Sequence, residues 1–411
     1  MLSKKNTKPE KQIVKTYKYK LYHSEKNKFL NEQTKICGNI YNHCIALHFR
    51  YYKIYGKHLN KFRLQKHITK LKKLNKYEFW NKVGSQAIQE ITDRIEKGYK
   101  AFFDNCKKKT KTRKVSPPSF KKVRAYQSFT LKQAGYKILP YNQIKIGKRI
   151  YRYHKSRNFE GKVKVVSVKK DTVGDWYISI TCELKNDPKL TSMTGKTAGF
   201  DFGCTTFLVQ NNGDKIESPL FFKQNKKKVA KANQKLSKKT KGSNNYQQAK
   251  LGLARIHKIV RNKRNDFHFK LAKELCEFYD IMLFETLDIS SMKKKHGKKI
   301  NDLGFSDFMR ILEDKALEYG KTIYHIDKWF ASTKNCNHCG YKNNNLTLKD
   351  RTWICPICNT KHHRDMNAAM NIIDKGLQEL SLEKENKKFM DGASSSWRED
   401  VSLDVSQAVL A

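Results

Sequence analysis

The sequence predicts a multidomain α+β protein: a β-barrel domain that carries a helical insertion, followed by a mixed α/β region with a small metal-binding ribbon. Three observations support this prediction. Apolar residues recur every three or four positions over residues 25–107 and alternate with other residues over 119–186. Four cysteines then form a tight cluster over residues 336–358. The 411 residues provide enough length for two or three domains.

The N-terminal part begins with a strand over residues 13–22, which the helical insertion separates from the rest of the barrel. The second helix of the insertion starts near Ser85, and isoleucines at helical spacing form its apolar stripe. The barrel resumes with two alternating runs around the loop 171–175, which is the pattern of a β-hairpin. We assign residues 1–24 and 108–190 to the barrel domain and residues 25–107 to the helical domain.

After a linker at residues 187–195, strand-like and helical segments alternate, which is typical of an α/β domain. The expected elements are a strand (197–210), a basic helical region (223–278), a strand (280–287), a basic loop (293–299), a helix (306–319), a strand (322–327) and a last helix that begins near Asp365. The Ser-rich tail, residues 381–411, has no periodicity, so we expect disorder there.

The net charge is the strongest compositional signal. Lys and Arg number 86 against 38 Asp and Glu, which gives a formal net charge of +48. Such a surplus repels itself in a compact protein unless a polyanion neutralises it, and nucleic acid is the obvious partner. No apolar run is long enough to span a membrane, and no apolar stretch of a signal peptide follows the Lys-rich N-terminus. We therefore expect a nucleic-acid-binding protein of the reducing cytoplasm, without a membrane partner.

The cysteine cluster consists of two Cys-x2-Cys pairs at the spacing of a zinc ribbon: Cys336 with Cys339, and Cys355 with Cys358. Each pair places two thiolates on one side of a tight turn, and Gly340 stands where the first turn needs a flexible residue. Four protein ligands close the coordination shell, so we expect one structural Zn²⁺ and not a catalytic one. The alternative is a pair of structural or redox dithiols.

Three carboxylates stand out because acids are scarce in this chain. Asp201 interrupts an otherwise apolar or small strand, Glu285 ends an apolar run, and Asp365 opens the last helix. A buried carboxylate is costly unless it is paired or binds a metal. On neighbouring elements these acids can hold two Mg²⁺ ions and activate water against a phosphodiester, whereas apart they would pair with Lys or Arg.

The segments around these acids resemble the three motifs of RuvC-like nucleases. They are Gly199-Phe200-Asp201-Phe202-Gly203, Phe284-Glu285-Thr286-Leu287 and Arg364-Asp365-Met366-Asn367-Ala368-Ala369-Met370-Asn371-Ile372. The order Asp, Glu, Asp, with a zinc ribbon before the last acid, resembles the transposon-encoded TnpB (OrfB) proteins, relatives of the type V CRISPR effectors. The lead-in to the ribbon, Ser332-Thr333-Lys334-Asn335-Cys336, is also similar. The sequence departs from the usual pattern at Asn359, where Gly is common, and at His363, where Asp is frequent.

The resemblance implies an architecture, an activity and partners. It identifies the barrel as a wedge domain, the helical insertion as a recognition domain, residues 196–329 and 364–380 as an RNase H-like RuvC domain, and residues 330–363 as an inserted zinc ribbon that binds target nucleic acid. It implies RNA-guided cleavage of double-stranded DNA next to a short target-adjacent motif, with a guide RNA from the transposon end. Asp201, Glu285 and Asp365 would hold two catalytic Mg²⁺ ions, for which Mn²⁺ can substitute, in a monomeric protein.

Several alternatives are compatible with parts of this pattern. A compact CRISPR-associated effector or a non-cleaving RNA-guided repressor has the same charge and ribbon, although the intact acids disfavour the repressor. A DDE transposase orders its acids as Asp, Asp, Glu, and a single-strand transposase needs a His-hydrophobe-His triplet that the sequence lacks. The P-loop-like segments at Gly195 and Gly320 lack the earlier Gly, since Leu190 and Lys315 stand there.

Nucleic-acid contacts are expected from two groups of residues. Gln86 and Gln89 begin the second helix of the insertion and have side chains that can read adenine edges, although surface Gln on a helix is common. The other group is basic and lies in the region 223–278 and directly before Asp365; its members are Arg255, Arg261, Arg264 and Arg364.

Overall fold

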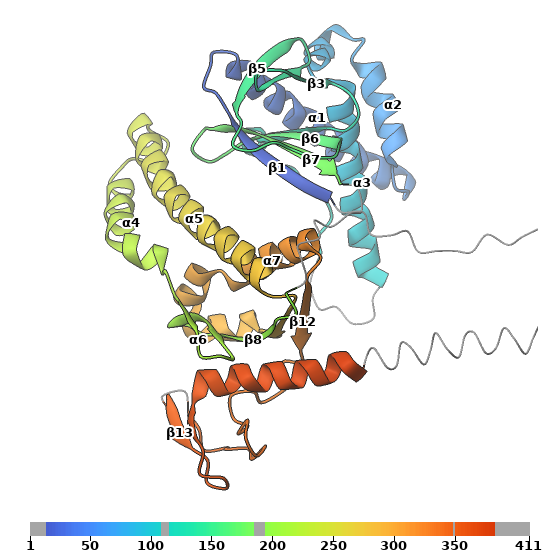
Figure 1. The fold of residues 1–411 in the computed structure, drawn as a ribbon. Coiled ribbons are helices and arrows are strands. Elements are labelled where there is room, and N and C mark those ends of the chain that lie inside the picture. Colours follow the sequence, from blue (N-terminus) through green and yellow to red (C-terminus); the bar gives the residue numbers. More distant parts are fainter. Residues whose placement is uncertain (1–13, 108–114, 185–193, 348–349, 383–411) are drawn as a thin grey trace, which may run out of the picture. The chain divides into compact units, whose positions relative to one another are not determined.

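The computed structural model describes residues 14–107, 115–184, 194–347 and 350–382 (Figure 1). The chain divides into two compact units, Met1–Asn186 and Asp187–Ala411. The predicted linker at 187–195 begins at this boundary, and most of it lies outside the described residues.

The N-terminal unit contains one antiparallel sheet of seven strands. In spatial order they are β2 (Ser128–Leu131), β6 (Lys162–Lys170), β7 (Trp176–Glu183), β1 (Val14–Leu21), β5 (Arg149–His154), β4 (Gln143–Ile146) and β3 (Tyr136–Leu139). β1 pairs with both β7 and β5, although the helical insertion separates it from them in sequence. β2 and β3 stand at the two ends of the hydrogen-bonded order, so the sheet is close to the expected barrel without a closing ladder between its described ends.

Alternation of side chains builds the core of this sheet. Along β7 every second residue is buried, and Ile178 and Ile180 have no exposed surface. The predicted β6–β7 hairpin is confirmed, because Gly174 takes a φ of 98° and donates its N–H to the Asp171 carbonyl. Only glycine adopts that backbone conformation without strain, so this residue allows the tight reversal.

The insertion is helical, as its spacing predicts. Its elements are α1 (Asn27–Tyr55), α2 (Lys61–Leu71), the 3₁₀ segment η1 (Asn75–Lys82) and α3 (Ser85–Lys107). The stripe of α3 that contains Ile88, Ile91 and Ile95 is buried, and it joins one apolar cluster with residues of the sheet. The sheet and its insertion therefore share a core.

The C-terminal unit is built on a mixed five-stranded sheet. Its order is β10 (Lys215–Glu217), β9 (Thr206–Gln210), β8 (Thr197–Phe202), β11 (Ile281–Glu285) and β12 (Thr322–Ile326). β8, β11 and β12 run parallel to one another, whereas β8, β9 and β10 form an antiparallel meander.

The single strand expected at 197–210 is wrong, because the chain reverses between β8 and β9. Gly203 lies in the reversal and donates its N–H to the Phe207 carbonyl at 3.3 Å. A Cβ atom at Gly203 would lie 2.5 Å from the carbonyl oxygen of Thr206, so the turn tolerates glycine and no larger residue. The continuous apolar composition of both strands concealed this turn in the sequence.

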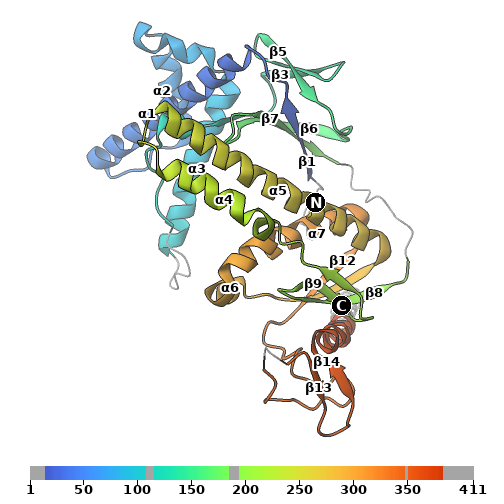
Figure 2. The same cartoon turned by 90° about the vertical axis from the view of Figure 1, so that its left-hand side faces the viewer.

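Two long basic helices replace the helical region expected at 223–278. They are α4 (Phe221–Ser237) and α5 (Asn244–Phe278), and Figures 1 and 2 show them side by side as a helical hairpin. Ser243 caps α5, since its hydroxyl accepts the N–H of Tyr246 at 3.1 Å. The helices α6 (Ile289–Leu303) and α7 (Phe305–Tyr319) follow β11, and Gly304 separates them in a left-handed conformation.

The basic loop expected at 293–299 is also wrong, because these residues lie inside α6. Asp288 caps this helix by accepting the N–H groups of Ser290 and Ser291, each at 3.1 Å. Lysine is a good helix former, so a run of lysines behind such a cap continues as a helix. The helix is interrupted only by a kink at His296, where φ is −130° and ψ is 34°.

The last helix, residues 364–382, packs across the sheet. A Cβ atom at Gly199 of β8 would lie 2.6 Å from the Ala369 carbonyl oxygen, and one at Gly376 would lie 2.5 Å from the Leu283 side chain of β11. Small residues thus let the helix approach both strands closely. The helix includes residues 381 and 382, which the sequence assigned to the tail, and the rest of the tail lies outside the described residues. No helix in the described part of the chain has the length and apolar character of a membrane span.

Candidate active site and metal centre

Two of the three predicted acids lie at the carboxyl ends of neighbouring parallel strands. The register pairs Phe200 of β8 with Phe284 of β11, so Asp201 and Glu285 are the next residues on the two strands. Parallel strands present their carboxyl ends at one edge of a sheet, which is the usual place for a functional site in an α/β fold. The sheet therefore brings these two residues to neighbouring positions, although they are 84 positions apart in the sequence.

The third acid arrives from the last helix. Asp365 is the second residue of the helix 364–382, whose packing on Gly199 carries its N-terminal end to the same edge of the sheet. The electrostatics of Asp201 are in line with this position of Asp365. Burial raises the pKa of Asp201 to about 8, and the next largest causes are the negative charges of Asp365 and Glu285.

The ribbon and the first residue of the last helix supply hydrogen-bond partners for two of these acids. The Ser332 hydroxyl donates to Oε2 of Glu285 at 2.9 Å. Arg351 and Arg364 each place a guanidinium nitrogen 3.0 Å from the Asp365 carboxylate. Burial raises the pKa of Glu285, and the bond from Ser332 opposes that rise.

The three carboxyl groups offer oxygen ligands of the kind that divalent cations bind. Burial first, and then the charges of Asp365 and Glu285, make the ionised form of Asp201 costly, and a divalent cation beside it would lower that cost. Among the described residues, only the four cysteines place three or more ligand atoms within 4.8 Å of one another. The three acids do not form such a group, so at least two of them have their carboxylate oxygens more than 4.8 Å apart.

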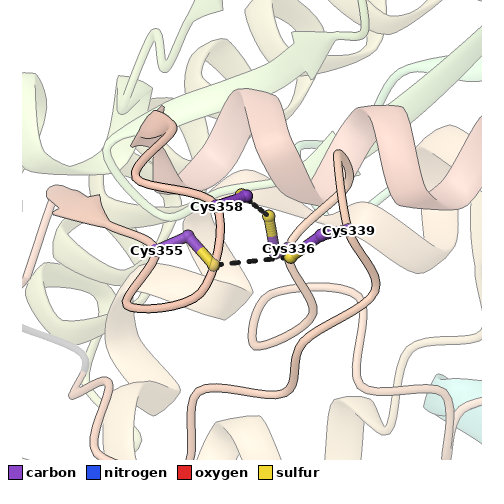
Figure 3. A group of neighbouring side chains, drawn as sticks. All are labelled: Cys336, Cys339, Cys355 and Cys358. Carbon is purple, nitrogen blue, oxygen red and sulfur yellow. Dashed lines mark hydrogen bonds between the residues drawn. The ribbon is translucent and has the colours of Figure 1, made fainter.

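The four predicted cysteines converge, as Figure 3 shows. The Sγ atoms of Cys336 and Cys358 are 3.6 Å apart, and those of Cys339 and Cys355 are 3.5 Å apart. Tetrahedral zinc with Zn–S bonds of about 2.3 Å requires sulfurs about 3.8 Å from one another. The sulfur positions thus fit one Zn²⁺ with four thiolate ligands.

The two Cys-x2-Cys turns have the same backbone geometry. In the first, Gly340 donates its N–H to the Cys336 carbonyl at 2.9 Å and has a φ of 77°. In the second, Asn359 donates to the Cys355 carbonyl at 2.9 Å and has a φ of 56°. Asparagine is the residue other than glycine that best tolerates this conformation, so the departure from glycine at Asn359 leaves the turn intact.

The described residues of the ribbon contain one short sheet. β13 (Thr352–Ile354) and β14 (Lys361–His363) pair antiparallel, and Trp353 and His362 face each other at 4.8 Å between ring centroids. The Nε2 atom of His362 lies 3.0 Å from the sulfur of Cys336. A neutral imidazole that donates to the sulfur would stabilise the thiolate, and this role of His362 was not evident from the sequence.

The predicted nucleic-acid contacts have different surroundings. Gln89, Arg255 and Arg261 are exposed, and Gln86 is partly exposed, so these four side chains are accessible. Arg264 instead donates to the Asn301 carbonyl at the end of α6 at 2.9 Å. Arg364 is only 7% exposed and donates to the Asp350 carbonyl as well as to Asp365, so its known hydrogen bonds lie inside the protein.

Sequence reasoning missed the side chains that connect the ribbon to the acids. Ser332, Arg351 and Asn371 have no local pattern that marks them, because their partners lie 14 to 47 positions away. The signal that could have drawn attention to Ser332 and Asn371 is their place inside the segments that carry the resemblance.

Comparisons with known proteins agree with these features. The family OrfB_IS605, described as "Probable transposase", matches residues 179–296, and the "Cas12f1-like, TNB domain" family matches residues 305–372. A "Putative RNA-guided DNA endonuclease" of Streptomyces pristinaespiralis is 29% identical over 377 residues, 89% of this chain and 90% of that protein. "Putative RNA-guided DNA endonuclease InsQ" of Escherichia coli K12 is 26% identical over 359 residues, 83% of this chain and 86% of that protein.

One solved structure shares the fold. The chain in "Cryo-EM structure of the Cas12f1-sgRNA-target DNA complex" aligns with a TM-score of 0.51 at 16% identity, over 85% of this chain and 83% of that one. At this identity the similarity establishes a common α+β architecture.

Proposed function

We propose that this chain, which belongs to the TnpB (OrfB) family, is an RNA-guided DNA endonuclease of a mobile element. The observation that carries the proposal is the convergence of Asp201, Glu285 and Asp365 at one edge of the C-terminal sheet. A protein that only bound nucleic acid would have no use for three carboxylates gathered in so basic a chain, because they repel phosphate.

The three acids would hold two Mg²⁺ ions, for which Mn²⁺ can substitute. When bound, the ions supply the activated water and the charge stabilisation that phosphodiester hydrolysis needs. Asp201 is the acid whose pKa the charges of both other acids raise, so it would contribute a ligand close to both of them. Glu285 keeps a fixed orientation through Ser332, and Arg364 fixes Asp365 from its buried position. The four cysteines would hold one structural Zn²⁺.

The partners follow from charge and family together. Relatives of this chain are named RNA-guided DNA endonucleases, and the net charge of +48 suits a long RNA together with a DNA duplex. We assign guide binding and target opening to the N-terminal unit and the basic helices, with base pairing reading the sequence and the protein reading a short flanking motif. The guide RNA would derive from the transposon end.

The domain limits are part of the same proposal. They are a wedge domain (1–24 and 108–190), a recognition domain (25–107), a RuvC domain (196–329 and 364–380) and a target-binding ribbon (330–363). The two-unit division after Asn186 agrees with the junction between the wedge and RuvC domains, and the ribbon is an insertion between β12 and the last helix.

The test is to purify the protein with its native flanking DNA, sequence the RNA that copurifies, and replace the 3′ end of that RNA. We expect cutting to move to DNA that matches the new 3′ end beside the same flanking motif. Binding should weaken steeply with salt, by about 0.7–0.9 in log affinity per log salt for each phosphate contact. RNA-free protein that cuts the same sites equally well would contradict the proposal.

A further inference from the structure

One serine of the ribbon lead-in lies between two elements of the candidate active site. Ser332 is 2% exposed, and its hydroxyl donates to Oε2 of Glu285 at 2.9 Å. Its backbone carbonyl accepts from Nδ2 of Asn371 at 2.7 Å. Asn371 belongs to the helix that begins beside Asp365. A single residue thus links strand β11 to the helix 364–382.

Asn371, which holds the backbone of Ser332, also bonds to a second carbonyl of the ribbon lead-in. The amide nitrogen of Asn371 has two hydrogens, and it donates to two carbonyls, those of Ser332 and Asn335, each at 2.7 Å. Asn367, one turn earlier on the same helix, also donates to the Asn335 carbonyl at 2.7 Å and accepts the N–H of Asn337 at 3.0 Å. Two buried amides therefore hold the lead-in of the ribbon against the last helix.

We propose that Ser332 is a positioning residue of the nuclease site: its hydroxyl orients the Glu285 carboxylate for metal binding, and Asn371 holds Ser332 in place for that task. The inference rests on the proposed function, since it gives Glu285 a metal to bind. A hydroxyl that donates to one carboxylate oxygen fixes the rotation of the group and leaves its other acceptor positions free. Partners of this kind tune metal affinity although they touch no metal.

The geometry gives the ribbon a second task beside binding nucleic acid. Ser332 contacts Glu285, and it stands only four positions before Cys336, where the first cysteine turn begins. The position of the ribbon is therefore connected to the orientation of the Glu285 carboxylate by a short stretch of backbone. Displacement of the lead-in would remove the hydrogen bond to Glu285 and loosen the metal site.

The experiment compares Ser332→Ala, Ser332→Thr and Asn371→Ala in the complex with copurified RNA. Mn²⁺ binding is measured directly by electron paramagnetic resonance, and cleavage is measured against Mn²⁺ concentration. We expect Ser332→Ala to raise the Mn²⁺ concentration for half-saturation by about 10–100-fold. Ser332→Thr keeps the hydroxyl and should bind Mn²⁺ nearly as wild type. Zinc content and RNA binding should not change in either variant.

Two further variants sharpen the result. Ser291→Ala removes a serine–carboxylate hydrogen bond of 2.7 Å to Asp288 at the exposed start of α6, so it is a matched control that should leave Mn²⁺ binding unchanged. Ser332→Ala and Asn371→Ala should be non-additive when combined, because both act on Glu285 through one serine.

Wild-type Mn²⁺ affinity in Ser332→Ala would overturn the inference, and so would a Ser332→Thr variant as weak as Ser332→Ala or a loss of zinc in parallel with the loss of Mn²⁺. These failures are distinct from failure of the proposed function. If wild type cuts and Asp201→Ala does not, the function stands and only the role of Ser332 falls. If wild type neither binds Mn²⁺ nor cuts, both proposals fall.

Discussion

The two units of the molecule both bury titratable groups, but they keep them neutral by different means. In the N-terminal unit, His48 is 2% exposed and burial lowers its pKa to about 4, while burial raises the pKa of Cys37 and of Cys44 to about 12. Each of these groups is neutral by itself at physiological pH. The C-terminal unit has similar members, such as His268 with a pKa of about 4, but it adds a cluster of carboxylates and a cluster of thiols.

The difference shows which unit depends on ions. A buried neutral imidazole or thiol carries no charge, so these groups of the N-terminal unit need no cation beside them. Converging carboxylates and thiols become stable as anions only beside a cation. We therefore expect metal binding to matter for the C-terminal unit alone, and four predictions test that contrast.

The largest effect should follow Asp201→Ala, which removes the acid whose pKa both of the other acids raise. Cleavage dependent on Mg²⁺ should fall by at least about 10²–10³-fold, because the variant loses charge stabilisation in the transition state. RNA binding should be nearly intact, since the basic surface is unchanged. Asp214→Ala, at the exposed turn between β9 and β10, is the matched control and should cut normally. An Asp201→Ala variant that cuts near the wild-type rate would refute the assignment of the site.

The second effect concerns zinc. Cys336→Ser should reduce the zinc content from about one ion per chain and lower the unfolding temperature of the C-terminal unit by about 10 °C or more, because binding energy there is folding energy. Metal analysis and calorimetry measure both. Cys106→Ser changes an exposed thiol of the N-terminal unit and should do neither. Well-folded wild-type protein without zinc would rule out the zinc assignment.

The third prediction separates the two units by thiol reactivity. Hydrogen bonds from Thr360 lower the pKa of Cys358 to about 5, so in protein treated with a chelator this thiolate should react with maleimide within minutes at pH 7. Cys37 and Cys44 should stay unmodified, because burial keeps them as thiols. Mass spectrometry of the labelled peptides gives the answer. Equal labelling of all three cysteines in folded protein would show that thiol reactivity does not differ between the two units.

Sequence alone could predict the parts of the site that local pattern encodes. The cysteine spacing and the acids in apolar strands identified the groups that the structure brings together, because each signal lies within a few residues. Periodicity likewise predicted β1, α3 and the β6–β7 hairpin. The prediction of one strand over 197–210 was wrong because the apolar composition hid the turn at Gly203. The prediction of a loop over 293–299 was wrong because a run of lysines suggested a loop where α6 continues.

The connection between ribbon and acids could not be predicted in this way. The partners of Ser332, Arg351 and Asn371 depend on how the ribbon folds back onto the sheet and the last helix. No periodicity records such a contact, since it joins residues from three separate elements. The hydrogen bonds of Arg264 and Arg364 to backbone carbonyls could not be predicted either, because their partners also lie on other segments of the chain.

The smallest effect is a difference in pH dependence between the units without added metal. His48 has a folded pKa of about 4, below its unfolded value of about 6.5, so the unfolded chain binds more protons between these values. The free energy of unfolding of the N-terminal unit should therefore fall by up to about 3 kcal/mol as pH drops from 6.5 to 4. His268 acts in the same direction in the C-terminal unit.

Asp201 acts in the opposite direction. Its folded pKa of about 8 exceeds its unfolded value of about 4, so the folded state binds more protons across that window, and the stability it contributes is lost as pH rises toward 8. The C-terminal unit should thus be less sensitive to acid than the N-terminal unit, and less stable at pH 8 than at pH 7. Calorimetry of both transitions across pH measures this. Asp201→Asn should abolish the loss toward pH 8, and saturating Mg²⁺ should do so in wild type, because a bound cation keeps the carboxylate ionised at no cost. Identical pH profiles for the two units in metal-free protein would show that burial and the neighbouring acids do not raise the pKa of Asp201.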